Sequence, residues 1–187
     1  MLSKARPPAG ALHRILRAAT RNDHALIDRM LLRFDLNRSA DYIDFLNVHF
    51  AALLALQADW RPQDDADFTQ MLNCLQVDLR RLGVQTATQP HSPRVPTSPA
   101  NGVGIAYVVR GSRLGAAVLR RSITAEHPTS YLDFVPALSW SLFLVDLEVI
   151  VGQPNGSNEV TAAAQGAFNV FVREFKRLQD TDSRSTP

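Results

Sequence analysis

The chain has 187 residues, of which 45% are apolar and 20% charged, and this composition excludes both a disordered and a membrane-embedded chain. Its 20 basic and 18 acidic residues leave a net charge of +2, too balanced for a dedicated nucleic-acid-binding protein. Arginine supplies 18 of the basic residues, and its fixed, bidentate geometry suits the capture of small ligands that carry carboxylates.

The single cysteine, Cys74, excludes an internal disulfide framework and a cysteine-based structural zinc site. A signal peptide is not expected, because His13, Arg14 and Arg17 interrupt the apolar character of the N-terminal segment. The longest apolar run, residues 140–151, contains two acidic residues and is too short to span a bilayer. We therefore expect a soluble, cytoplasmic protein that binds neither a membrane nor nucleic acid.

Three amphipathic helices are predicted in the first half of the chain, because apolar residues recur there at steps of three and four. The first covers residues 12–32, and the second begins at Ser39, whose hydroxyl can cap it. The third follows Pro62 and ends near Gly83, a residue that favours a left-handed cap. Residues 1–10 are expected to form a tail.

The second half is predicted to be helical too, after a proline-rich surface loop at residues 84–101. A helix interrupted by glycines comes next, although residues 105–109 alone could form a strand. The remaining elements are a short helix near Ser130, a helix over residues 138–150, a turn at residues 152–156 and a closing helix over residues 163–178. With a frayed polar tail at residues 180–187, the prediction is an all-α fold with one domain over residues 11–179.

Two histidines share the apolar stripe of a predicted helix, His24 in the first helix and His49 in the second. A buried imidazole needs a partner, so each could be a core histidine bonded to a backbone carbonyl or a metal ligand. No H-E-x-x-H or carboxylate-x-x-His pattern joins them, so a zinc site is not supported. The remaining histidines, His13, His91 and His127, are expected to be exposed to solvent.

Four glycines gather between Gly102 and Gly115, and each one inside a helix costs about 1 kcal/mol relative to alanine. Close packing between helices could offset that cost. A flat ligand that lies against a backbone without side chains could offset it as well. Spacing alone slightly favours the packing explanation.

Three sequence strings stand out by their order and spacing. They are LRAATRNDH at residues 16–24, YxxFLxxH at residues 42–49 and GxAYVVRGSRLG at residues 104–115. Together they resemble the bacterial heme oxygenases of the biliverdin-producing type. The resemblance runs from about Leu12 to Leu178, and the aromatic residues around Phe171 are similar to the closing helix of that family.

This resemblance implies an all-α fold that holds heme between a proximal helix and a glycine-kinked distal helix. It makes His24 the axial iron ligand, through a neutral imidazole nitrogen. The other implied site residues are Gly111, Ser112 and Gly115 as the catalytic distal segment, Arg17 and Arg21 beside the heme propionates, and Tyr107 and Phe168 in the pocket wall.

The chain departs from the family pattern in three places. Ser112 stands where animal members have an aspartate that organises water, and Ala116 stands where many members have a second glycine. Residues 136–151 contain no lysine or arginine, although family members often place a propionate-binding base there. These departures bear on heme seating and on the biliverdin isomer more than on the fold.

The implied activity is the oxidative opening of heme, both substrate and cofactor, to biliverdin, carbon monoxide and ferrous iron. No G-x-G-x-x-G string follows a predicted strand, so the electrons would come from an external reductase or ferredoxin. A phytochrome could receive the biliverdin. Two alternatives remain open: a non-catalytic heme- or bilin-binding protein of the same fold, and an all-α interaction module in which His24 belongs to the core.

Overall fold

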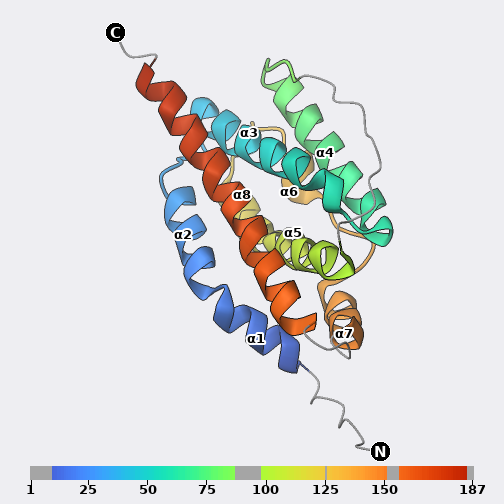
Figure 1. The fold of residues 1–187 in the computed structure, drawn as a ribbon. Coiled ribbons are helices and arrows are strands. Elements are labelled where there is room, and N and C mark those ends of the chain that lie inside the picture. Colours follow the sequence, from blue (N-terminus) through green and yellow to red (C-terminus); the bar gives the residue numbers. More distant parts are fainter. Residues whose placement is uncertain (1–9, 87–97, 125, 151–155, 185–187) are drawn as a thin grey trace, which may run out of the picture.

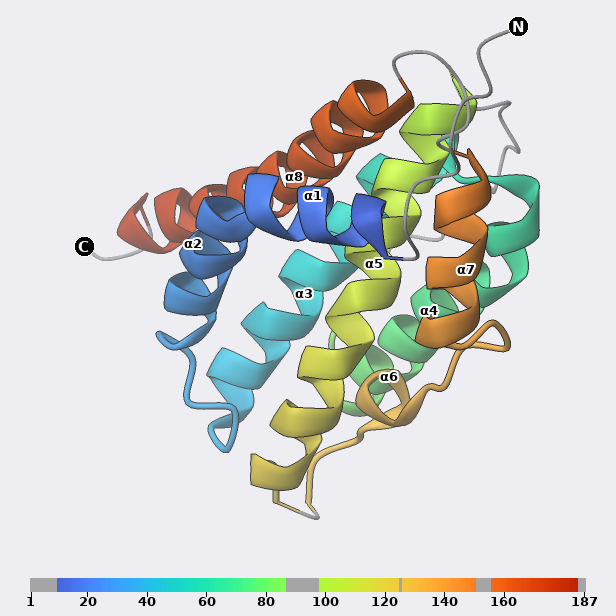
Figure 2. The same ribbon diagram turned by 90° about the horizontal axis from the view of Figure 1, so that it is seen from below.

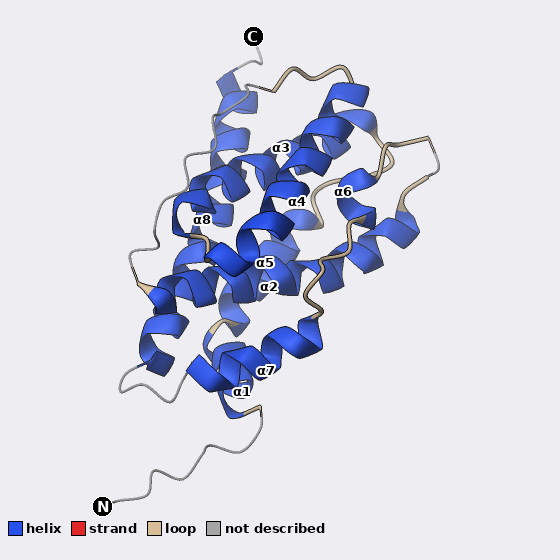
Figure 3. Ribbon diagram, turned by 90° about the vertical axis from the view of Figure 1, so that its right-hand side faces the viewer, coloured by secondary structure: helices blue, strands red, loops and turns tan. Residues whose placement is uncertain are grey.

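The computed structural model describes residues 10–86, 98–124, 126–150 and 156–184. Within these residues the regular secondary structure is entirely helical (Figure 3). The α-helices are α1 (Ala11–Ala19), α2 (Arg21–Leu31), α3 (Ser39–Leu56), α4 (Pro62–Arg81), α5 (Pro99–Leu119), α6 (Ser130–Asp133), α7 (Trp140–Ile150) and α8 (Gly156–Arg184). The predicted all-α fold is confirmed, and residues 105–109 are helical rather than a strand.

The predicted first helix is wrong in one respect, because it consists of two helices that meet at Thr20. The Thr20 hydroxyl donates to the carbonyl of Leu16 at 2.8 Å, and such side-chain bonds compete with regular helical pairing. The side-chain amide of Gln165 donates to the carbonyl of Ala19 at 3.2 Å. A residue from α8 therefore satisfies a backbone group that the break leaves free.

Two further boundaries differ from the prediction. Helix α5 begins at Pro99, inside the expected loop, because the Ser98 hydroxyl accepts a hydrogen bond from the Asn101 N–H at 3.1 Å and caps the helix. Helix α8 continues to Arg184, through residues that were expected to fray. Residues 87–97 of the loop, and all of the expected turn before Gly156, lie outside the described residues.

The long helix α8 organises the molecule, since it packs against α1, α2, α3 and α5 (Figure 1). Figure 2 shows α1 lying across α8 on one side and close to α7 on the other. The tightest crossing is that of α5 with α8 at Gly104. A Cβ atom there would lie 2.5 Å from the Cβ of Ala163 and 2.6 Å from the backbone of Val160. This glycine therefore serves close helix packing.

Helix α5 is long and apolar enough to pass for a membrane span. Within the stretch Pro99–Ser122, an 18-residue window has a mean hydropathy of 1.2, and 61% of that window is buried inside the protein. Such burial is typical of a core helix, and the helix is continuous through its four glycines.

Charged residues buried beneath the helices join α4 to α5. The Arg110 guanidinium donates to the Asp64 carboxylate at 2.7 and 2.9 Å and to the carbonyl of Leu138 at 3.0 Å. Arg61 also contacts Asp64, and Asp67 pairs with Arg110 at 2.9 Å. This cluster fixes the segment before α7 against the rest of the fold.

Candidate functional site

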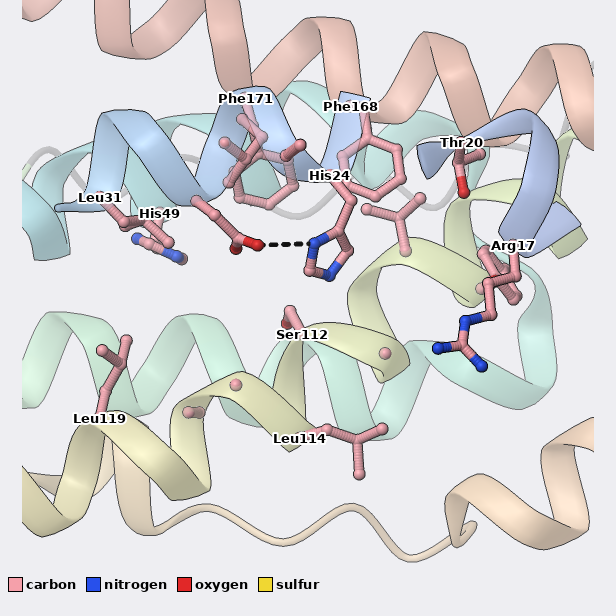
Figure 4. Close-up of a pocket in the computed structure, with 18 of the residues that line it drawn as sticks. Arg17, Thr20, His24, Leu31, His49, Ser112, Leu114, Leu119, Phe168 and Phe171 are labelled. Atoms are coloured by element: carbon pink, nitrogen blue, oxygen red, sulfur yellow. Dashed lines mark hydrogen bonds and ion pairs between the residues drawn. The ribbon is translucent and has the colours of Figure 1, made fainter. Parts of the chain in front are cut away.

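A cavity of about 800 Å³ lies between α1 and α2 on one side and α5 on the other, with α3 and α8 contributing its inner surface (Figure 4). All eight of the site residues predicted from sequence line it. They are Arg17, Arg21, His24, Tyr107, Gly111, Ser112, Gly115 and Phe168. The break at Thr20 lies in the wall of this cavity, between Arg17 and His24.

The His24 side chain points from α2 toward α5 and is 67% exposed (Figure 4). Its Nδ1 lies 3.0 Å from Oδ2 of Asp28, one turn further along the helix. Because a carboxylate only accepts, Nδ1 donates to Asp28, and the tautomer that carries its proton on Nδ1 keeps a lone pair on Nε2. The alternative in which His24 is a core histidine bonded to a backbone carbonyl is wrong, because its side chain is exposed and bonded to Asp28.

His49 has the environment of a core histidine. It is buried, and its Nδ1 donates to the carbonyl of Phe45 at 2.8 Å. The rings of Tyr131 and Phe171 lie 5.6 Å from its own ring. Burial lowers the pKa of His49 to about 4, so this imidazole is neutral at pH 7. His49 also lines the inner surface of the cavity, opposite the exposed residues that line its outer side.

The α5 wall owes its shape to two glycines. A Cβ atom on Gly115 would meet nothing within 4 Å, and one on Gly111 would lie 3.6 Å from the Trp140 ring. Gly104 thus fits the packing explanation of the glycine-rich helix, while Gly115 leaves free space beside the backbone. The Ser112 hydroxyl donates to the carbonyl of Val109 at 2.7 Å, which leaves its oxygen lone pairs free to accept.

The cationic end of the cavity is built on α1. Arg17 is exposed there, and the Tyr107 hydroxyl of α5 hydrogen-bonds to Thr20 close to it. Burial raises the pKa of Tyr107, so the hydroxyl stays protonated and can donate at neutral pH. Arg21 also lines the cavity, at the start of α2.

His13 was expected to be solvent-exposed, and this expectation is wrong. The ring is half-buried in the cavity wall, 6.1 Å from the ring of Tyr107 and 5.9 Å from that of Trp140. Its position could have been inferred, since it lies four residues before Arg17 and thus on the same face of α1. His127 is half-buried as well, stacked on Tyr42 outside the cavity, whereas His91 lies outside the described residues.

Helix α7 closes the same end of the cavity. Its Glu148 carboxylate accepts hydrogen bonds from the backbone N–H groups of Leu12 and His13, at 2.9 and 3.4 Å. A negative charge at a helix N-terminus is favourable, because the free N–H groups there carry partial positive charge. Helix α7, which contains no lysine or arginine, thus provides an aromatic residue, Trp140, for the cavity wall and a hydrogen-bonded anchor for the start of α1.

The residues that line the cavity include one acidic side chain, Asp28, which is bonded to His24. Within the described parts of the chain, no three His, Cys, Asp or Glu side chains gather as a protein-only metal centre would require. A metal ion bound to His24 would therefore need donors supplied by the ligand, as the ring nitrogens of a porphyrin do.

The arrangement of these helices matches a known structure. The NO- and CO-bound heme oxygenase from Neisseria meningitidis superposes with a TM-score of 0.69, and the match covers 89% of this chain and 91% of that chain. This chain has the heme oxygenase fold. The sequence identity is 20%, so the likeness concerns the fold, and no protein-family model or curated protein sequence matches the chain.

Proposed function

We propose that the protein is a heme oxygenase, which opens heme to biliverdin, carbon monoxide and ferrous iron with dioxygen and electrons from an external reductase or ferredoxin. One observation carries this proposal. Across a single cavity, a free imidazole nitrogen of His24 on α2 faces the α5 backbone, which has no side chain at Gly115.

The cavity suits heme in size, polarity and shape. Its volume of about 800 Å³ lies in the range of cofactor pockets, and aromatic residues such as Phe168 line the α8 side. A flat macrocycle fits between two helices when one of them carries a glycine at the contact. Arg17 and Arg21 provide the cations that the two propionates of heme need for binding.

Different residues of the cavity would have different roles in the reaction. His24 would hold the iron through Nε2, and Asp28 would hold the ring in one tautomer by accepting from Nδ1. Gly111 and Gly115 would leave room for dioxygen along α5. Ser112 accepts a hydrogen bond from water in that space and so helps to place a proton there. When bound, heme supplies the iron that activates dioxygen and the ring that is oxidised.

A non-catalytic heme- or bilin-binding protein is the second candidate, and the Ser112 hydroxyl favours it. This hydroxyl donates to Val109 and not into the cavity, where animal heme oxygenases have a carboxylate that organises water. Aerobic incubation of the heme-loaded protein with an electron donor distinguishes the two. A heme oxygenase loses the Soret band and gains bilin absorbance, while a binding protein keeps its Soret band.

The axial ligand is tested by substitution. We expect His24→Ala to abolish normal axial ligation, seen as a changed Soret maximum and coordination state, because the unbonded Nε2 of this exposed ring faces α5 across the cavity. His49→Ala is the control, since the His49 ring is buried. An unchanged spectrum in His24→Ala together with a lost one in His49→Ala would reverse the assignment.

The proposal also includes a location and a receiver for the product. We place the protein in the reducing cytoplasm, because its single cysteine gives no sign of an oxidising compartment. The receiver that we propose for biliverdin is a phytochrome.

A further inference from the structure

His13 lines the cavity, and the proposed function gives it no role. Its ring sits where α1, α5 and α7 meet, held between Tyr107 and Trp140. Its backbone N–H is bonded to Glu148, so the residue is fixed in position at the start of α1. Within the described residues, neither ring nitrogen of His13 has a hydrogen-bond partner, which leaves both nitrogens available to a ligand.

The charges around the cavity are distributed unevenly. Arg17 follows His13 by one turn, and its positive charge lies close enough to the Tyr107 hydroxyl to influence the pKa of Tyr107. The acidic residue, Asp28, lies on the other side of His24, more than one turn of α2 beyond the break. Glu148 also lies at the α1 end, but its carboxylate is bonded to the backbone of Leu12 and His13 and does not line the cavity. A ligand carboxylate in the cavity is therefore attracted toward Arg17 and repelled from Asp28, and Glu148 offsets part of this attraction.

We propose that His13 donates a hydrogen bond to a carboxylate of the ligand, next to Arg17, and so fixes which way round the ligand lies. The inference rests on the proposed function, since heme carries two propionates on one edge. It also explains how the chain binds a propionate although α7 contains no lysine or arginine. An imidazole on α1 takes the place of a base on the neighbouring helix.

The test compares ferric heme with its dimethyl ester, in which both carboxylates are blocked. We choose His13→Phe, because phenylalanine keeps an aromatic ring between Tyr107 and Trp140 but has no N–H group. Each protein is titrated with each compound, and binding is followed by Soret absorbance. We expect about tenfold weaker binding of heme by His13→Phe, the scale of one hydrogen bond to a charged group, and equal binding of the ester by both proteins.

The matched control is Arg14→Gln. Arg14 is the exposed neighbour of His13 and lies outside the cavity lining. The variant therefore measures the effect of removing a nearby positive charge that does not contact the ligand. Equal heme affinity in His13→Phe and wild type overturns the inference, and so does an equal loss for heme and ester, which would reflect packing alone. If the wild-type protein binds no heme at all, the proposed function fails, and this inference fails with it.

Discussion

Asp28 influences the chemistry of His24 more than the stability of the protein. Their side chains are 57% and 67% exposed, and ion pairs in water contribute only about 0–1 kcal/mol. A carboxylate that accepts from Nδ1 nevertheless makes the ring a stronger iron ligand. The value of the pair therefore appears only when a metal is bound.

We predict that Asp28→Asn changes the free energy of unfolding by less than about 0.5 kcal/mol. In the heme complex it should lower the iron–histidine stretching frequency, because an amide oxygen accepts more weakly than a carboxylate. Resonance Raman spectra and urea unfolding check the two halves of the prediction. Asp23→Asn is the control on the same helix, and an unchanged frequency in Asp28→Asn would contradict the assignment of the pair.

His49 makes stability depend on pH. Its pKa is about 4 in the folded protein and about 6.5 in the unfolded chain, so the unfolded chain binds more protons between these values. Stability is then complete above about pH 6.5 and falls as the pH drops toward 4. Between pH 7 and pH 5 the wild type should lose about 2 kcal/mol more than His49→Phe, measured by urea unfolding at both values. Equal losses in the two proteins would show that the histidine is not buried neutral.

Sequence spacing placed His24 and His49 on apolar stripes but did not distinguish their environments. Periodicity reports which face of a helix packs against the rest of the protein, and the apolar faces of α2 and α3 both do so. What separates them is how deeply their helices are buried: α3 has nine buried residues, whereas α2 has none. That difference arises from tertiary packing, which one stripe of residues does not encode.

At the scale of elements, the glycines of α5 have opposite energetic effects. Gly104 touches α8, and a methyl group there would have to push the two helices apart. Gly115 has free space and a helical backbone, so it only weakens the helix. The same residue type therefore contributes stability at one position and lowers it at another.

We predict that Gly104→Ala destabilises the protein by roughly 2–3 kcal/mol, whereas Gly115→Ala stabilises it by about 0.5–1 kcal/mol. Thermal and urea unfolding give the comparison. Gly115→Leu should impair heme turnover more than folding, because its side chain fills the free space of the cavity. Normal turnover in Gly115→Leu would mean that this space has no part in the reaction.

The sequence predicts the helix boundaries that nearby residues determine, and it misses those that depend on residues far away in the sequence. The start at Pro62 follows from proline, and the structure has a helix there. A helix also begins at Ser39, but the predicted cap is wrong, because Arg38 is the N-cap residue and no side chain caps α3. The break at Thr20 was missed, because it depends in part on a hydrogen bond from Gln165, which is far away in the sequence. Pro99 was assigned to a loop, although proline suits the first turn of a helix.

For the whole molecule, the buried Asp64 cluster could not be read from the sequence. Asp64 and Arg110 are 46 residues apart, and both look like ordinary surface charges on amphipathic helices. In the structure Asp64 is fully buried and bonded to two arginines. Removing one partner of such a group leaves an uncompensated charge in the interior.

We predict that Asp64→Ala lowers the free energy of unfolding by about 3–5 kcal/mol, because Arg61 and Arg110 would both lose a buried carboxylate. Asp133→Ala is the comparison. It removes a carboxylate that pairs with Arg120 at the surface, and it should cost less than about 1 kcal/mol. Urea unfolding at pH 7 measures both. Similar costs for the two variants would show that burial of the cluster does not set its contribution.

The hydrogen bonds that hold α1 in place also set the order in which the protein can be assembled. Leu12 is bonded to a carboxylate 136 positions later, and Ala19 to an amide 146 positions later. These partners are synthesised long after α1 itself, so α1 is anchored late. Contacts between distant parts of a chain form slowly, because a long loop must close first. A growing chain should therefore complete the cavity wall that α1 forms only after α7 and α8 have left the ribosome.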